Sequence, residues 1–100
     1  MTMDVVYRLN DIDFVWDRKK ARANLQKHGE PFETSCEIFF DPYLRSIRSM
    51  VIDGEERGVA IGLTKGWQLL VVVYTLRAES IRIISARLAT GHERTQYEDR

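Results

Sequence analysis

The chain has 100 residues with 15 basic and 15 acidic side chains, so its formal net charge is zero, and 44% of its residues are hydrophobic. This length suits one domain with a single core, expected over residues 1–100 with residues 1–13 as an N-terminal extension. The composition excludes a disordered chain. The longest apolar run, residues 69–76, is far shorter than the ~20 residues that cross a bilayer. We therefore expect a cytoplasmic protein without a membrane partner.

Residues 18–28 are predicted to form the first helix, because Ala, Arg, Lys, Gln and Leu favour helices. Asp17 is a suitable N-cap, and Gly29 is a suitable left-handed stop. Few apolar side chains lie on this helix, so it presents a basic side to water. A polar stripe at helical spacing comprises Lys20, Asn24 and Lys27.

A second helix is predicted to begin at Pro31 and to end before Asp41 and Pro42. Its apolar side chains recur at helical spacing. From residue 45 onward the apolar period changes to two, which predicts strands at residues 45–52, 56–63, 67–76 and 80–87. The short links between them favour antiparallel neighbours.

The strand at 67–76 is apolar on both faces, which predicts a central position with helices covering one side. One face of the strand at 56–63 carries only small side chains, so either another element packs very close or a shallow groove stays open. Thr90 and Glu93 match a capping box that begins a short C-terminal helix. Residues 14–16 add at most one short edge strand, and we expect Trp16 and Trp67 to pack in the core.

These elements define an α+β fold with two N-terminal helices, a four-stranded antiparallel sheet and a short C-terminal helix. The single cysteine, Cys36, lies apart from both histidines in the sequence. No metal-ligand spacing follows, so we expect no metal and no other cofactor, and we interpret Cys36 as a core residue.

Positive charge is concentrated in residues 18–29, which carry no acidic side chain. A second acid-free stretch, residues 80–91, contains Arg82 and Arg87. If the two stretches meet in space, they form one basic patch suited to nucleic-acid phosphates. The zero net charge argues against this interpretation, because nucleic-acid binders usually carry a basic surplus.

Four segments resemble the BrnT toxin family in order and spacing: WDRKKARANLQKHGEPFE, DGEERGVAIG, LLVVVYT and IRIISARLATGHERTQYE. The resemblance covers residues 14–98. It implies a RelE-like fold and a ribonuclease toxin of a type II toxin–antitoxin system, neutralised by a cognate BrnA-like antitoxin. It also implies that the complex with the antitoxin, rather than this chain, binds operator DNA. The chain departs from the family pattern at Arg18, where proline is common, and at Pro31, where a capping serine is usual.

RNA cleavage without a metal uses the ribose 2′-hydroxyl as nucleophile, and it needs a base, an acid and cations around the phosphoryl group. Arginine suits the last role, because its planar fork stays charged and grips two phosphate oxygens. Histidine suits proton transfer, because imidazole titrates near neutral pH. From the resemblance and this chemistry, the predicted catalytic residues are His28, Arg57, Arg82, Arg87 and Glu93, and the predicted RNA contacts are Lys20, Asn24, Lys27 and Tyr97.

The spacing of Arg82 and Arg87 raises a geometric question. They are five residues apart, so in a regular strand their side chains point to opposite faces. Either a bulge or the end of the strand brings them together, or only one of them lies in the site.

Each candidate also has an ordinary structural interpretation. His28 caps the first helix, Arg57 pairs across strands, Glu93 completes the capping box, Tyr97 fills the core, and Lys20 and Lys27 lie on a solvated helix face.

Two functions follow. The first is a metal-independent endoribonuclease toxin with RNA as substrate and a BrnA-like antitoxin as partner. The alternative is a non-catalytic RelE-like module that binds protein or RNA. The enzyme predicts RNA cleavage in EDTA, whereas the module predicts binding without cleavage.

Overall fold

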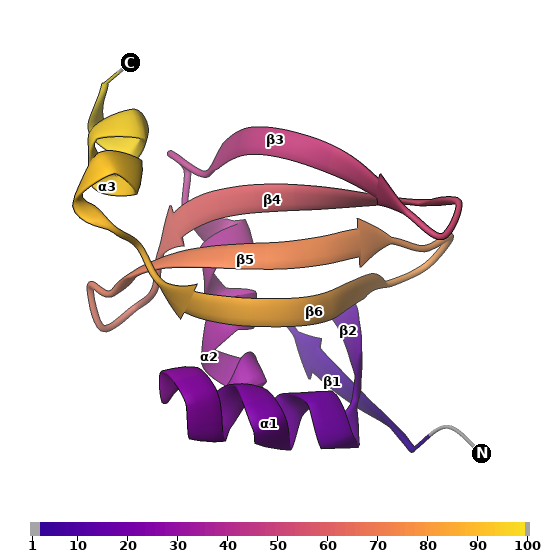
Figure 1. Ribbon diagram of the computed structural model, residues 1–100. Coiled ribbons are helices and arrows are strands. Elements are labelled where there is room, and N and C mark those ends of the chain that lie inside the picture. The colour runs from indigo at the N-terminus through magenta and orange to yellow at the C-terminus, as the bar shows by residue number, and fades with distance from the viewer. Residues whose placement is uncertain (1–2, 100) are drawn as a thin grey trace.

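The computed structural model describes residues 3–99, which form a sheet with helices on one side and at one end (Figure 1). In chain order the elements are β1 (Asp4–Leu9), β2 (Ile12–Asp17), α1 (Arg18–His28), α2 (Phe32–Ser35), the 3-10 helix η1 (Cys36–Phe40), β3 (Arg45–Ile52), β4 (Glu55–Leu63), β5 (Leu69–Leu76), β6 (Ile81–Leu88) and α3 (Gly91–Glu98). None of the helices within this range is long and apolar enough to cross a membrane.

The predicted α+β class and the four antiparallel strands β3 to β6 are confirmed, but the sheet is larger than the four strands, with at most one short edge strand, that were predicted. Within residues 3–99 the strands form one six-stranded sheet in the order β1-β2-β6-β5-β4-β3, and it is mixed because β2 runs parallel to β6. The two additional strands form a hairpin that turns at Asn10 and Asp11, both with positive φ. Asn and Asp tolerate that conformation, which tight hairpin turns require. The segment at 14–16 is therefore part of a longer strand inside the sheet.

The helices begin and end near the predicted positions, except that the second one changes from α-helix to 3-10 helix. Asp17 accepts a hydrogen bond from the backbone N–H of Lys20 at 3.0 Å, and Gly29 ends α1 with φ 72°. Both predicted caps of α1 are thus confirmed. The second predicted helix is only four residues of α-helix and continues as η1. Its residues still bury their apolar side chains, because Phe32, Cys36 and Ile38 are all in the core.

The main core lies between the sheet and the helical segments α1, α2 and η1. It contains Phe14, Trp16, Phe32, Cys36, Ile38, Ala60, Leu70, Val72, Ile83 and Ala86. The small residues of β4 face this side, and a Cβ at Gly62 would lie 2.7 Å from Cβ of Ile38. Of the two alternatives for that face, close packing is therefore the correct one. Burial also raises the pKa of the Cys36 thiol well above its usual value.

The opposite side of the sheet is covered only in part. Val59, Ile61, Leu69 and Val71 form a second cluster there with Tyr97 of α3. In Figure 1, α3 lies over one end of the sheet, where β6 ends. We call this side of the sheet, beyond the area covered by α3, the open face.

Candidate functional site

A bulge in β6 places Arg82 and Arg87 on the same face of the sheet. Arg87 is opposite Val71 and Arg82 is opposite Thr75, with a shift of register between Val73 and Tyr74 that leaves Ile84 as the extra residue. Val71 and Thr75 are four residues apart on β5, so their side chains share a face. Directly opposed residues also share a face, which puts both arginines on the open face. Of the three alternatives that the spacing of Arg82 and Arg87 left open, the bulge is the one found in the structure.

Arg57 of β4 lies on the open face too. On one side Arg57 pairs with Met50 of β3. On the other side, Gly58, the residue after Arg57, pairs with Tyr74 of β5. Because β4 and β5 are antiparallel, Arg57 lies beside Thr75, the residue after Tyr74. Arg57 and Arg82 thus flank Thr75 in one row across the sheet. Arg87 lies four residues farther along, about 13 Å at the usual rise of a strand. The arginines therefore form a pair and a more distant third member, not a single tight clamp.

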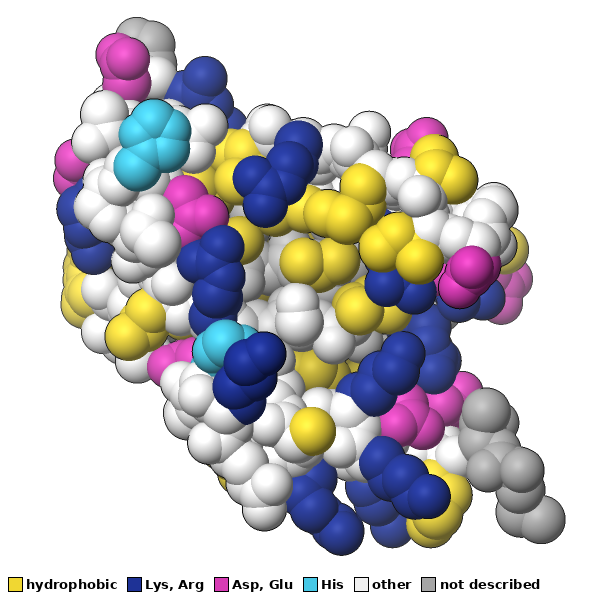
Figure 2. All heavy atoms as spheres, viewed as in Figure 1, with side chains coloured by type: hydrophobic (Ala, Val, Ile, Leu, Met, Phe, Trp, Pro, Cys, Tyr) yellow, Lys and Arg dark blue, Asp and Glu magenta, His cyan; other side chains and the backbone are white. Residues whose placement is uncertain are grey.

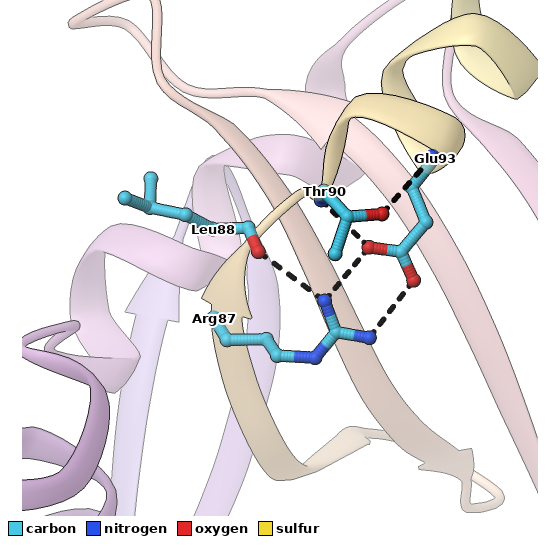
Figure 3. A network of polar contacts seen from close by, with 4 residues as sticks. All are labelled: Arg87, Leu88, Thr90 and Glu93. Carbon is cyan, nitrogen blue, oxygen red and sulfur yellow. Dashed lines mark hydrogen bonds and ion pairs between the residues drawn. The ribbon is translucent and has the colours of Figure 1, made fainter.

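Arg87 is held by Glu93 of α3 through two hydrogen bonds of 2.7 and 2.8 Å (Figure 3). Figure 3 also shows that the same carboxylate accepts the backbone N–H of Thr90, while the Thr90 hydroxyl accepts the backbone N–H of Glu93. This arrangement confirms the predicted capping box. Glu93 is only 7% exposed, and the guanidinium of Arg87 lowers its pKa from 4.5 to about 2. Its carboxyl group is therefore ionised at neutral pH.

This pair predicts a pH dependence of stability. Because the pKa of Glu93 is lowered on folding, the pair stabilises the fold above about pH 4.5, and the contribution is lost as the pH falls toward 2. Glu93→Gln should therefore show a smaller loss of unfolding free energy than wild type over this range. Urea unfolding at several pH values measures the difference, with the exposed Glu98→Gln as control. Parallel pH curves for wild type and Glu93→Gln would contradict the assignment.

Arg82 is paired with Asp4 of β1. Its two terminal nitrogens donate to the two carboxylate oxygens at 3.1 and 3.0 Å. The hydrogen bond raises the pKa of Arg82 and lowers that of Asp4. The N-terminal strand therefore contributes a carboxylate to the open face.

Arg57 is the least engaged of the three arginines. Its Nε is buried and has no hydrogen-bond partner among residues 3–99, where the nearest carboxylate oxygen, on Glu55, is 3.9 Å away. Glu55 has a closer partner in Arg77, at 2.9 Å. Sequence reasoning missed Arg77, whose position in a turn carried no signal.

The predicted residues of α1 divide into two groups. Lys20 and Lys27 are exposed and His28 is half-buried, and none of the three forms an ion pair with another residue in the range 3–99. Asn24 is 7% exposed, and its amide bonds the backbone N–H and C=O of Ala86 and the C=O of Glu30. We do not carry Asn24 forward as an RNA contact, because its hydrogen-bonding groups are used inside the protein.

The bonds of Asn24 also position His28. Beyond its short pairing with β2, strand β6 has a free edge, and α1 runs along it (Figure 1). At that edge the side-chain amide of Asn24 bonds both the backbone N–H and the backbone C=O of Ala86, the groups that a neighbouring strand would otherwise bond. The last turn of α1, which ends at His28, is thereby held beside the segment that contains Arg87.

Tyr97 and the tryptophans occupy different environments. Tyr97 is 8% exposed, and its hydroxyl donates to Asp41, so we also leave it out of the proposed RNA contacts. Trp16 is buried as predicted, but Trp67 is 81% exposed, and the prediction that it packs in the core is wrong. Trp67 lies in the β4–β5 turn with φ 64° and borders a mainly apolar cavity of about 380 Å³. None of the three arginines lines that cavity.

Cationic side chains border an apolar surface on the open face. Figure 2 shows hydrophobic side chains over the sheet with Lys and Arg side chains on several sides of them. Within residues 3–99, no group of three or more His, Cys, Asp or Glu side chains is placed to hold a metal ion. Among the groups on this face are the guanidinium groups of Arg57, Arg82 and Arg87, a type of group that binds phosphate.

Residues 16–93 match the family model described as the ribonuclease toxin BrnT of type II toxin–antitoxin systems. The chain belongs to this family of ribonuclease toxins. Its structure also resembles that of the Brucella abortus ribonuclease toxin BrnT, with a TM-score of 0.50 and 23% sequence identity, over 75% of this chain and 92% of that chain. This likeness supports the fold. No match was found among curated proteins.

Proposed function

We propose that the chain is an endoribonuclease that binds and cleaves RNA on the open face without a metal ion. The observation that carries the proposal is the β6 bulge, which brings Arg82 and Arg87 to the face that also carries Arg57. Membership of a ribonuclease toxin family supplies the reaction class. The separation of Arg87 from the other two favours contacts with different phosphates along one RNA strand.

In the proposed reaction the ribose 2′-oxygen forms a bond to the adjacent phosphorus, and the bond from phosphorus to the 5′-oxygen of the next nucleotide breaks. A base takes the proton of the 2′-hydroxyl, and an acid protonates the departing 5′-oxygen. Negative charge grows on the phosphoryl oxygens, where arginine side chains stabilise it. Arg57 is best suited to this role, because its guanidinium is the least neutralised by carboxylates.

His28 remains our candidate for proton transfer, supported by its place in the turn of α1 that Asn24 holds beside Ala86. Glu93 is a weaker candidate for the acid, because with a pKa of about 2 it has no proton to give at neutral pH. We assign it the role of positioning Arg87. Lys20 and Lys27, exposed and without ion pairs among the described residues, are proposed to contact the RNA backbone.

The proposed partner is a BrnA-like antitoxin that covers the open face and blocks access of RNA to the arginines. Operator DNA is proposed to bind only the complex, through the antitoxin. The proposed location is the cytoplasm, where the RNA substrate is found.

One observation favours the alternative of a non-catalytic binding module. Arg82 and Arg87 already carry paired carboxylates, from Asp4 and Glu93. If RNA displaces neither, the face binds RNA through Arg57 and the lysines without completing a catalytic site.

Purified, antitoxin-free chain is expected to cleave single-stranded RNA in the presence of EDTA, leaving 2′,3′-cyclic phosphate and 5′-hydroxyl ends. Gel analysis of an end-labelled RNA measures both cleavage and the chemistry of the ends. An RNA in which every 2′-hydroxyl is replaced by hydrogen is the matched control, and it should stay intact. Binding of RNA without cleavage would support the module instead.

A further inference from the structure

We propose that Asp4 is an intramolecular competitor of RNA: its carboxylate occupies the phosphate-binding edge of Arg82 and has to leave when RNA binds. This inference rests on the proposed function of the open face. It assigns to the N-terminal strand a role in setting RNA affinity.

The geometry of the pair supports competition. Both terminal nitrogens of Arg82 donate to Asp4, one to each carboxylate oxygen. A phosphate group is bound by the same edge of a guanidinium, through the same pair of parallel hydrogen bonds. The two anions therefore cannot use that edge together. Arg82 is 20% exposed and Asp4 is 35% exposed, so solvent and a ligand reach the pair.

The contrast with Glu93 shows why Asp4 is the displaceable carboxylate. Glu93 is buried and also accepts the backbone N–H of Thr90, so its departure would break the cap of α3. The Asp4 side chain bonds Arg82 alone among the described residues. It begins β1, a strand at the edge of the sheet with a single neighbour. When the Asp4 side chain moves away, the protein therefore loses the ion pair with Arg82 and no other side-chain hydrogen bond of Asp4 among the described residues.

Asp4 also lies outside the residues that match the family model, which begin at residue 16. The carboxylate that pairs with Arg82 thus comes from outside the matched segment, whereas Arg82 lies within it. If Asp4 competes with RNA, the variant Asp4→Asn should bind RNA more tightly than wild type.

Asp13→Asn is a matched control. Asp13 lies in the same hairpin and pairs with Arg8 at 2.8 Å, so this variant removes the same charge from a neighbouring ion pair that does not include Arg82. Fluorescence anisotropy with a labelled single-stranded RNA, made uncleavable by 2′-O-methyl groups, measures the dissociation constant at low ionic strength. We expect Asp4→Asn to bind about two- to fivefold more tightly than both wild type and Asp13→Asn, as for the loss of an exposed ion pair.

If the proposal is correct, the gain in RNA affinity caused by Asp4→Asn requires Arg82. In an Arg82→Gln background, the substitution Asp4→Asn is expected to leave RNA affinity unchanged. Circular dichroism and thermal unfolding verify that each variant is folded, and Asp4→Ala replaces Asp4→Asn if the latter is not. Equal affinity of Asp4→Asn, Asp13→Asn and wild type would overturn the proposal, as would weaker binding by Asp4→Asn or a gain that persists without Arg82.

The same measurements separate this proposal from the nuclease assignment. A gain in affinity that needs Arg82 supports the competition even if no variant cleaves an unmodified RNA, in which case the nuclease assignment fails alone. Cleavage by wild type together with unchanged affinity of Asp4→Asn overturns the competition and leaves the nuclease assignment intact.

Discussion

Replacing Arg57 by glutamine is expected to lower the rate of RNA cleavage about 100-fold, the usual cost of removing one preorganised donor from a charged transition state. Among the three arginines, Arg57 allows the cleanest test. Removing the Arg57 guanidinium leaves no carboxylate without an ion-pair partner, because Glu55 keeps its closer partner Arg77. The free energy of unfolding should therefore stay near the wild-type value, and single-turnover cleavage of a labelled RNA measures the rate.

Arg8→Gln is the control for the loss of an arginine elsewhere on the sheet. Arg8 pairs with Asp13 in the β1–β2 hairpin and is not part of the row formed by Arg57 and Arg82. This variant should cleave RNA at nearly the wild-type rate. If Arg57→Gln also cleaves at that rate while remaining folded, Arg57 does not stabilise the transition state.

Replacing Asn24 by alanine is expected to lower the free energy of unfolding by about 3 kcal/mol, because it leaves buried backbone groups without partners. The N–H and C=O of Ala86 both lose their hydrogen bonds at the edge of β6, and the C=O of Glu30 loses another. For a domain of this size, the melting temperature should fall by roughly 10–20 °C. Thermal and urea unfolding measure both quantities.

Gln26→Ala is the matched control for this substitution, because Gln26 is exposed on the same helix. It should change the free energy of unfolding by less than about 0.5 kcal/mol. If Asn24→Ala is as stable as Gln26→Ala but binds RNA more weakly, Asn24 is an RNA contact and the structural role described above is wrong.

Local signals predicted much of the fold. Asp17 and Gly29 marked the ends of α1, since a cap depends on the conformation and hydrogen bonds of a few adjacent residues. The alternation of apolar residues predicted β3 to β6 within a few residues, because one side of each strand faces a core. Glu93 was recognised as part of a capping box for the same local reason.

The errors of prediction concern longer-range packing. Residues 1–13 were assigned only as an extension, because whether the hairpin joins the sheet depends on the pairing of β2 with β6, more than 60 residues away. Trp67 is apolar and borders a strand, yet it lies in a turn whose direction points it into solvent. The internal hydrogen bonds of Asn24 likewise had no signal in the sequence, where it falls on the polar side of α1 with Lys20 and Lys27, because they depend on the position of the β6 edge.

For the candidate site, the residue types and their acid-free surroundings could be identified from the sequence, because charge and side-chain chemistry do not depend on folding. Which face each arginine occupies, and which carboxylate it meets, was decided by the tertiary structure. The bulge at Ile84 placed Arg82 and Arg87 on the same face of the sheet, and the hairpin placed Asp4 beside Arg82. Both outcomes depend on strand register, and register is set by how distant segments pack against one another rather than by neighbours in the chain.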